Sequence, residues 1–372
     1  MAPVNTSLGR RAAVIALVFV VEFAVLEAGL RVYAAFEGSS TFQSLFMDDP
    51  QVGVRLRPNT SIRYTTVEFS TAIAVNPQGV RDDEPIGPKA ANERRVVVLG
   101  DSLVLSVQVG LAQTFCERLE ARLNARGGPD RWRVINGGVQ GYGPVDEWLF
   151  FDKVAAAFEP DVVLIVAFVG NDAIEAADSA ASFEAGAPVR SAQPQVRQLR
   201  RLLRSSVVWQ AVRVRWDQLR GRLALGTPER PLATYLADPP SIVDEGLAIS
   251  RRAFGRLAER AAAIGARTGV VLMPARFQVN DEDYGHLAAA VRDAGGVLDR
   301  QSASRRFGDA LAPLGLPMID LQPLLAAQPD PSGLFFQRNV HLTPRGHDLV
   351  SGILEAFLDT SGLLRPAAGD AR

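Results

Sequence analysis

Short apolar runs alternate with longer amphipathic stretches from residue 94 to the end of the chain. The runs are rich in valine, isoleucine and leucine, as buried strands are, and the stretches between them have the spacing of helices. The predicted strands cover residues 94–99, 132–135, 161–169, 268–273 and 317–321. The predicted helices cover residues 111–126, 144–157, 241–265, 284–294 and 344–364. This regular alternation is typical of an α/β domain with a parallel sheet, which we place at residues 93–366.

A different pattern opens the chain. Residues 12–30 follow two arginines and are apolar except for Glu22 and Glu27. A helix of this length can just span a bilayer, and basic residues before it favour placement of the following chain outside the cytoplasm. We expect residues 1–35 to be an anchor in the bacterial inner membrane, with the bulk of the chain facing the periplasm or exterior. There are two alternatives: a signal sequence that is cleaved to give a secreted protein, and a surface helix.

Two further segments depart from the α/β alternation. Residues 36–92 contain short alternating runs at 61–66 and 68–75, separated by turn residues, which predicts a small β-rich extension or, alternatively, a tether. Residues 175–245 form an insertion in which residues 197–222 hold eight arginines around an apolar helical stripe. Such a helix packs on the core, covers the site as a lid, or rests on an anionic membrane.

Composition narrows the possible functions by exclusion. Lys and Arg total 40 against 41 Asp and Glu, so the net charge of −1 creates no field that would attract nucleic acid. Cys116 is the only cysteine, which excludes an intrachain disulfide and a cysteine-based metal site. The histidines are His286, His341 and His347. No metal or organic cofactor is implied, and a catalytic imidazole must be one of these three.

Ser102 follows the first predicted strand within Gly100-Asp101-Ser102-Leu103. Open α/β sheets bind ligands at the carboxyl ends of their strands, and the amides at the start of the next helix stabilise negative charge there. Ser102 is therefore a candidate nucleophile, although a serine at this position also serves as an ordinary helix N-cap.

Three other strand or loop ends supply the remaining groups for nucleophilic ester cleavage. His341 lies just before the last predicted helix and is the candidate base, since His347 falls inside that helix. Gly141 can present a backbone N–H with no side chain in the way, and Asn171 offers an amide donor. Together with the Ser102 N–H, these donors would stabilise an oxyanion.

These blocks resemble, in order, those of the GDSL-type or SGNH hydrolases. Ser102, Gly141, Asn171 and His341 match the serine, glycine, asparagine and histidine for which that superfamily is named. The resemblance implies a flavodoxin-like three-layer α/β fold and an acyl-serine mechanism. The apolar N-terminal stretch and residues 76–81 are similar to those of membrane-anchored bacterial members.

One departure concerns the group that orients the histidine. The last block of the family usually carries an aspartate two or three residues before the histidine, where this chain has Asn339 and Arg338. In serine proteases, replacing that kind of aspartate by asparagine lowers kcat by about 10⁴ through the wrong tautomer. Three readings remain: a Ser–His dyad with a backbone carbonyl or Asn339 holding the ring, a carboxylate from elsewhere such as Asp330 or Asp172, or a weak site kept for binding.

From this resemblance we expect a carboxylic ester hydrolase or O-acyltransferase. Its expected substrate is the acylated carbohydrate of an envelope or exported polysaccharide, as in polysaccharide O-acetylation. The alternatives are a non-catalytic carbohydrate-binding or assembly protein on a hydrolase fold, and a lipase or thioesterase.

Overall fold

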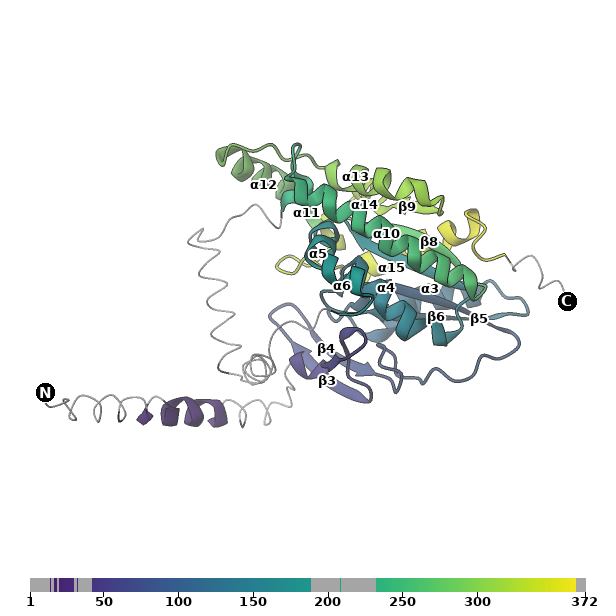
Figure 1. The fold of residues 1–372 in the computed structure, drawn as a ribbon, viewed down its shortest axis with the longest axis horizontal. Coiled ribbons are helices and arrows are strands. Elements are labelled where there is room, and N and C mark those ends of the chain that lie inside the picture. The colour runs from purple at the N-terminus through teal and green to yellow at the C-terminus, as the bar shows by residue number, and fades with distance from the viewer. Residues whose placement is uncertain are drawn as a thin grey trace, which may run out of the picture. The chain divides into compact units, whose positions relative to one another are not determined.

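The computed structural model describes residues 42–188, 208 and 232–365, together with residues 14, 17, 18, 20–29 and 32. They belong to two compact units: the larger spans Leu45–Arg190 and Pro228–Arg372, and the smaller spans Met1–Ser44 and Ser191–Thr227. Figure 1 labels the helices and strands. The arginine-rich helix expected at residues 197–222 lies outside the described residues, apart from Val208.

A five-stranded parallel sheet forms the centre of the larger unit, in the order β6-β5-β7-β8-β9. The strands are β5 (Glu93–Gly100), β6 (Arg131–Gly138), β7 (Val162–Phe168), β8 (Arg267–Met273) and β9 (Met318–Asp320). The first strand lies inside the sheet and the chain crosses over in both directions from it, which is the flavodoxin-like order. The predicted parallel α/β sheet is confirmed.

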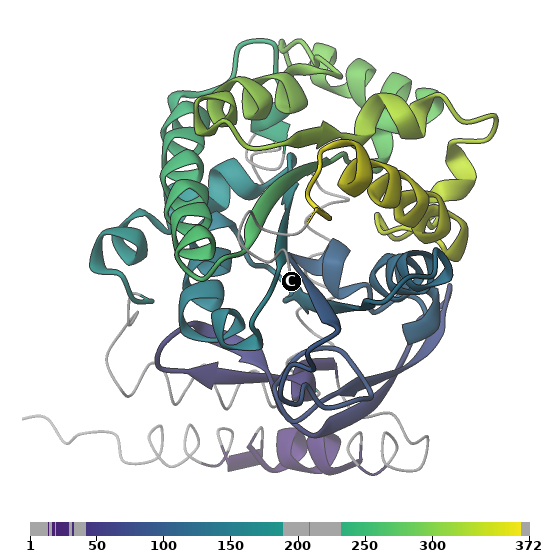
Figure 2. The same cartoon turned by 90° about the vertical axis from the view of Figure 1, so that its right-hand side faces the viewer.

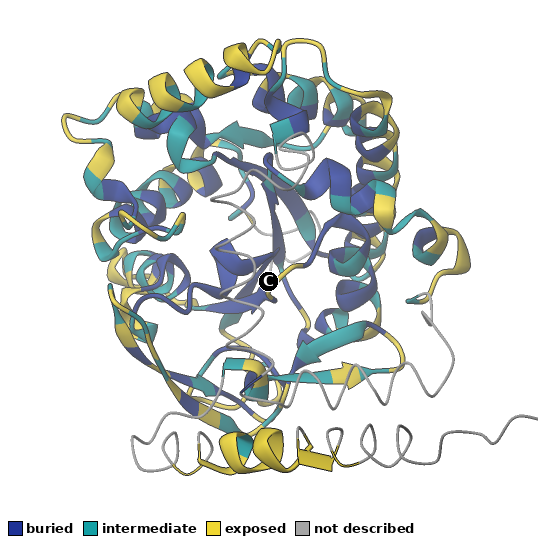
Figure 3. Cartoon of the chain, turned by 90° about the vertical axis from the view of Figure 1, so that its left-hand side faces the viewer, coloured by how far each residue is buried: buried dark blue, intermediate teal, exposed yellow. Residues whose placement is uncertain are grey.

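Helices cover both faces of this sheet, which is why its strands read as continuous apolar runs. Val96 and Val98 of β5 pack in one core with Leu119 of α3 (Phe115–Ala125) and Leu354 of α15 (Pro344–Thr360). The other face is covered by α4 (Pro144–Lys153) and α10 (Ser241–Ala263), and Figure 2 shows the strands between the two layers. In Figure 3 the strands at the centre of the sheet are mostly buried, and exposed residues lie on the outer sides of the covering helices and in loops.

Shorter helices complete the larger unit. They are α2 (Ser102–Leu105), α5 (Asp172–Asp178), α6 (Ala180–Ala185), α11 (Arg276–Val279), α12 (Asp281–Asp293), α13 (Ser302–Leu311) and α14 (Leu321–Ala326). Its short 3₁₀ turns are η2 (Leu111–Gln113), η3 (Ala155–Phe158), η4 (Ala233–Tyr235), η5 (Ala312–Leu314) and η6 (Ser332–Leu334), while η1 (Phe42–Leu45) falls almost entirely in the smaller unit. Helix α13 was not expected from the sequence, because its buried stripe is mostly of small residues and includes only two large apolar side chains, Phe307 and Leu311.

The strand predicted at residues 132–135 is longer than expected. It continues through Asn136, Gly137 and Gly138, which pair with the last residues of β5. The polar Asn136 is buried there because its Nδ2 donates to the Val104 carbonyl at 2.8 Å and its Oδ1 accepts from the Gly138 N–H. A buried amide with both ends satisfied costs little, so a polar residue can stand in a central strand.

Two antiparallel hairpins precede the sheet. The first joins β1 (Phe46–Asp49) to β2 (Gly53–Leu56), and the second joins β3 (Thr60–Thr65) to β4 (Ser70–Val75). The alternating runs at residues 61–66 and 68–75 therefore pair with each other. The cross-strand partners Ile62 and Ile73 are buried, and every second residue of β4 (Thr71, Ile73 and Val75) is buried, as one-sided strands require.

The smaller unit contains the apolar stretch near the N-terminus. Residues 20–29 are helical, and apolar side chains such as Val20, Phe23 and Val25 are exposed. The backbone N–H of Val208 donates to Glu27 Oε2 at 3.0 Å. Among the described residues, no helix combines the length and apolarity needed to cross a membrane.

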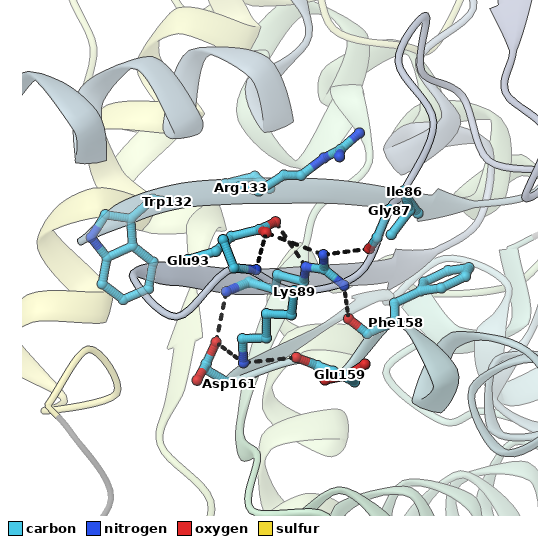
Figure 4. A network of polar contacts seen from close by, with 12 residues as sticks. Ile86, Gly87, Lys89, Glu93, Trp132, Arg133, Phe158, Glu159 and Asp161 are labelled. Atoms are coloured by element: carbon cyan, nitrogen blue, oxygen red, sulfur yellow. Dashed lines mark hydrogen bonds and ion pairs between the residues drawn. The ribbon is translucent and has the colours of Figure 1, made fainter. Parts of the chain in front are cut away.

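A buried arginine organises the edge of the sheet where β5 begins. Arg95 donates to Glu93 Oε1 at 2.8 Å, to the Phe158 carbonyl at 2.9 Å and to the Gly87 carbonyl at 2.7 Å. Figure 4 shows this network, in which Lys89 also reaches Asp161 at 2.7 Å. The contacts join the segment before β5 to the loop before β7, at the edge opposite to Ser102.

Candidate active site

Ser102 is the first residue of α2, directly after β5, and its side chain is 8% exposed. The turn that presents it needs glycine at position 100. Gly100 has a φ of 157°, and a Cβ there would overlap the Val104 side chain. Asp101 caps the helix by accepting from the Leu103 N–H at 2.8 Å. The N-cap role is thus taken by Asp101, which leaves the Ser102 hydroxyl free of it.

His341 meets Ser102 across the edge of the sheet. Its Nε2 lies 2.8 Å from Ser102 Oγ, although 239 positions separate the two residues in sequence. The loop that carries His341 is closed by bonds between Phe336 N and the His341 carbonyl and between Thr343 N and the Leu334 carbonyl. This distance lets an imidazole take the proton of the hydroxyl directly.

Asn339 occupies the other side of the imidazole. Its Oδ1 lies 2.5 Å from His341 Nδ1 and 3.2 Å from the His341 backbone nitrogen. A backbone N–H can only donate, so the atom of the amide that faces it must be the oxygen. The Nδ1 then carries the ring proton, and the Nε2 lone pair faces Ser102 Oγ. This is the tautomer that a general base requires.

The carboxylates considered as substitutes lie elsewhere. Asp330 pairs with Arg345 and bonds to Ser332, and Asp172 Oδ2 accepts from the Phe168 N–H at 2.8 Å. Of the groups that the structure describes, Asn339 is the one hydrogen-bonded to the Nδ1 of His341. The third position beside serine and histidine is therefore filled by a neutral amide.

Burial lowers the pKa of His341 to about 4. No negative charge opposes this shift, because Asn339 is neutral. The imidazole is therefore unprotonated at neutral pH and can accept a proton. The imidazolium formed during a reaction would keep the hydrogen bond to Asn339 but would have no ion pair with it.

The two candidate oxyanion residues follow the strands on either side of β5. Gly141 comes after β6 and has a φ of 74°, and the space where a Cβ would stand is open. Asn171 precedes α5, after β7, and its Nδ2 donates to Glu175 Oε1 at 2.7 Å. Since β6 and β7 flank β5 in the sheet, Gly141 and Asn171 lie on opposite sides of Ser102 at the same edge.

Comparison with known proteins adds fold-level likenesses. No family model matches the sequence, and no curated protein sequence matches it. Among solved structures, TesA is 13% identical with a TM-score of 0.41, covering 72% of this chain and 99% of its own. A two-domain esterase active on acetylated mannans is 12% identical with a TM-score of 0.40, covering 73% and 50%. A GDSL-like lipase from Bacteroides thetaiotaomicron is 11% identical with a TM-score of 0.39, covering 74% and 92%.

The chain resembles the SGNH hydrolases. The four residues that carry the resemblance in sequence stand at one edge of a parallel sheet, with the serine and histidine in hydrogen-bond contact. The site differs from the usual SGNH pattern at Asn339, as the sequence indicates.

A cluster of largely buried acids lies beneath this SGNH-like site, and the sequence pattern did not indicate that cluster. Its members are Asp101, Asp146, Glu147, Asp172 and Glu175. Burial raises the pKa of Glu147 and Asp172 well above their ordinary values, and the neighbouring acids add to the effect. Burial likewise raises the pKa of Glu175 to about 8. These three groups hold protons at neutral pH, whereas Asp101 and Asp146, whose pKa burial raises only to about 6, are mostly ionised.

The remaining histidines have other surroundings. His347 is buried in α15, where its Nδ1 accepts from the Phe115 N–H at 3.2 Å and its ring stacks on Phe115. His286 is exposed on α12. Within the described residues, no group of three or more His, Cys, Asp or Glu side chains is arranged to hold a metal ion.

Proposed function

We propose that the chain is a member of the SGNH hydrolases and cleaves carboxylic esters through an acyl-serine. The observation that carries this proposal is the continuous contact from Ser102 Oγ through His341 to Asn339 Oδ1, at 2.8 Å and 2.5 Å. The carboxyl edge of a parallel sheet supplies the access and the backbone donors that acyl transfer needs.

In the proposed reaction, Ser102 Oγ attacks the ester carbonyl while its proton passes to His341 Nε2. The backbone N–H groups of Ser102 and Gly141 and the amide of Asn171 stabilise the oxyanion that forms. His341 then returns the proton to the leaving alcohol as the C–O bond breaks. Water attacks the acyl-serine by the same route to release the acid, or an acceptor hydroxyl takes the acyl group instead.

The proposed substrate is the acyl group on a carbohydrate outside the cytoplasm, with the apolar N-terminal segment as a membrane anchor. This choice of substrate and location rests on a resemblance: the apolar N-terminal segment and residues 76–81 are similar to the corresponding segments of membrane-anchored SGNH proteins. Transfer of the acyl group from Ser102 to a carbohydrate hydroxyl, in place of water, would use the same chemistry. The neutral Asn339 favours a second candidate, a carbohydrate-binding or assembly protein on the same fold. A lipase or thioesterase differs only in the acyl pocket.

Labelling and turnover together test the proposal. The purified full-length chain should react with a fluorophosphonate probe at Ser102, as found by peptide mass spectrometry, and should hydrolyse 4-nitrophenyl acetate. Acetylated xylan, acetylated mannan and 4-nitrophenyl esters of longer acids separate a carbohydrate esterase from a lipase. A folded protein that neither reacts with the probe nor turns over any ester would leave the binding protein as the function.

Substitution of Asn339 by Asp should move the pH profile in a defined direction. The wild-type protein keeps its base unprotonated down to about pH 4, the pKa of His341, so kcat/KM should fall only below that pH. A carboxylate beside the ring stabilises the imidazolium and raises the pKa of His341 by about 1 to 3 units. The acid limb of the Asn339→Asp profile should therefore appear at higher pH, and kcat at pH 7 should rise about 10- to 100-fold.

Asn339→Ala serves as the control for this prediction. It removes the acceptor for the Nδ1 proton without adding charge, so activity should fall and the pH at which the acid limb appears should not rise. If the acid limb of Asn339→Asp coincides with that of the wild type, Asn339 does not act on His341 in the reaction.

A further inference from the structure

The segment before the sheet contacts three of the loops that carry the site. We call residues 45–86, which comprise both hairpins and the turn after them, the brace. Tyr142, next to Gly141, donates its hydroxyl to the Val54 carbonyl at 2.5 Å. The backbone N–H of Arg338 donates to Glu68 Oε1 at 2.9 Å, near His341. Contacts of this kind fit a scaffold for the site and not a tether.

The most extensive contact of the brace is made by Arg81 on the nucleophile helix. Its guanidinium donates to the carbonyls of Leu105 at 2.8 Å and Val109 at 2.6 Å, and also to that of Ser106. Thr71 adds a bond from its hydroxyl to the Gln108 carbonyl at 3.1 Å. The brace thereby holds four carbonyls between residues 105 and 109, just after Ser102.

The helix α2 depends on such support because it is only four residues long. It ends at Leu105, and its C-cap residue Ser106 lies in the left-handed region with a φ of 56°. The last carbonyls of a helix have no partner within the helix, and buried carbonyls without partners are costly. Arg81, which is 1% exposed, supplies partners for the carbonyls of Leu105 and Ser106 at the end of this helix from one side chain. Burial lowers the pKa of Arg81 only to about 10, so it stays charged at neutral pH.

The turn that delivers Arg81 is itself fixed by hydrogen bonds. Asn76 Oδ1 accepts from the backbone of Gln78 at 3.0 Å and of Val80 at 3.2 Å. Asn76 Nδ2 donates to the Glu84 carbonyl at 3.0 Å, and Gly79 adopts a φ of 80° that favours glycine. The backbone turn that carries Arg81 is therefore fixed by contacts within the brace and not by contacts with α2.

We propose that Arg81 is a positioning residue for Ser102. By fixing the carbonyls of Leu105, Ser106 and Val109, it holds α2 so that Ser102 Oγ stays within reach of His341 Nε2. A displacement of about 1 Å in such a site costs on the order of 100-fold in rate. The inference rests on the proposed function for its catalytic consequence, but the ordering of α2 is measurable without any turnover.

Arg95 provides a matched control, because it is also a buried arginine that donates to backbone carbonyls. It lies at the opposite edge of the sheet, at the start of β5. Arg81→Met and Arg95→Met should both lower the melting temperature. Only Arg81→Met should lower kcat for 4-nitrophenyl acetate, by about 100-fold with KM little changed, and slow fluorophosphonate labelling of Ser102 similarly. Arg81→Lys keeps the charge but not the forked set of donors, so its kcat and its labelling rate should lie between those of Arg81→Met and the wild type.

Amide hydrogen exchange separates this inference from the proposed function. Arg81→Met should speed exchange in residues 102–109, and Arg95→Met should not. If the wild type proves inactive, a specific loosening of residues 102–109 still supports Arg81 as the residue that orders α2, and only the esterase proposal fails. Equal effects of the two substitutions on exchange and on kcat would overturn the inference. If Arg81→Met does not fold, Arg81→Lys and Thr71→Val take its place in the same comparison.

Discussion

Ser102→Ala should lower kcat for 4-nitrophenyl acetate by about 10⁴-fold or more, with the fold intact. The hydroxyl is the one group placed 2.8 Å from the base, and no neighbouring hydroxyl shares that contact in the described structure. The nearby Ser106 cannot replace it, because its Oγ donates back to the carbonyls of Leu103 and Val104. Removing the nucleophile should also abolish fluorophosphonate labelling. Steady-state kinetics and intact-mass analysis measure the two effects.

Two histidine variants accompany this measurement. His341→Ala should be about as damaging as Ser102→Ala, since the serine and the base act as a unit. The double variant should then be little worse than either single one. His286→Ala changes an exposed histidine on α12 and should leave kcat unchanged. Retention of more than about a tenth of the activity in Ser102→Ala, against the loss expected for a missing nucleophile, would contradict the assignment.

Asn171→Ala should lower kcat by about 10²- to 10³-fold with a much smaller effect on KM. The amide offers one Nδ2 hydrogen to Glu175, and that bond fixes the plane of the amide so that the other hydrogen can face the oxyanion. The charge to be stabilised exists only in the transition state, so the loss falls on kcat. Initial rates over a range of ester concentrations give the two constants.

Further Asn171 variants show whether the amide donates. Asn171→Asp keeps the shape of the side chain but replaces the NH₂ donor by a carboxyl oxygen, so it should lower kcat at least as much as Asn171→Ala. Asn124→Ala removes an exposed amide that bonds to the backbone of Trp132 and should leave kcat unchanged. A rise in KM at constant kcat would show that Asn171 binds the ground state and is not an oxyanion donor.

Much of the α/β core could be predicted because its strands are buried on both faces. Four apolar residues in a row, as at residues 96–99, leave few alternatives to a central parallel strand. Because parallel strands end at the same edge of a sheet, Ser102 and Asn171 can be placed together even when the helices are not predicted. The order of the blocks in sequence was therefore enough to propose the members of the site.

Buried charge was not predictable in the same way. From the sequence, Arg81 and Arg95 would be expected on the surface. The burial of Arg81 depends on the Leu105 carbonyl, more than twenty positions away, and that of Arg95 on the Phe158 carbonyl, more than sixty positions away. Glu147 likewise reads as part of a solvated helix start, although it is 1% exposed. Sequence spacing carries no signal of such partners, because the partner atoms are backbone groups that every residue has.

The sequence also could not predict which end of the Asn339 amide faces His341. An asparagine can offer an oxygen or an NH₂ group to a ring nitrogen, and the two choices give opposite tautomers of His341. The choice is decided here by the backbone N–H of His341, which shares the same oxygen. That geometry depends on the bend of residues 339–341.

The contacts of the brace also determine which segment of the gene can be exchanged by recombination without loss of function. A gene segment that begins at Glu93 would carry all four blocks of the site but leave Arg81, Glu68 and Val54 behind. The nucleophile helix would then face its new neighbours with unpaired carbonyls. Exchange of catalytic portions between related genes should therefore preserve function only when the crossover falls before Leu45, so that the hairpins and the sheet descend together.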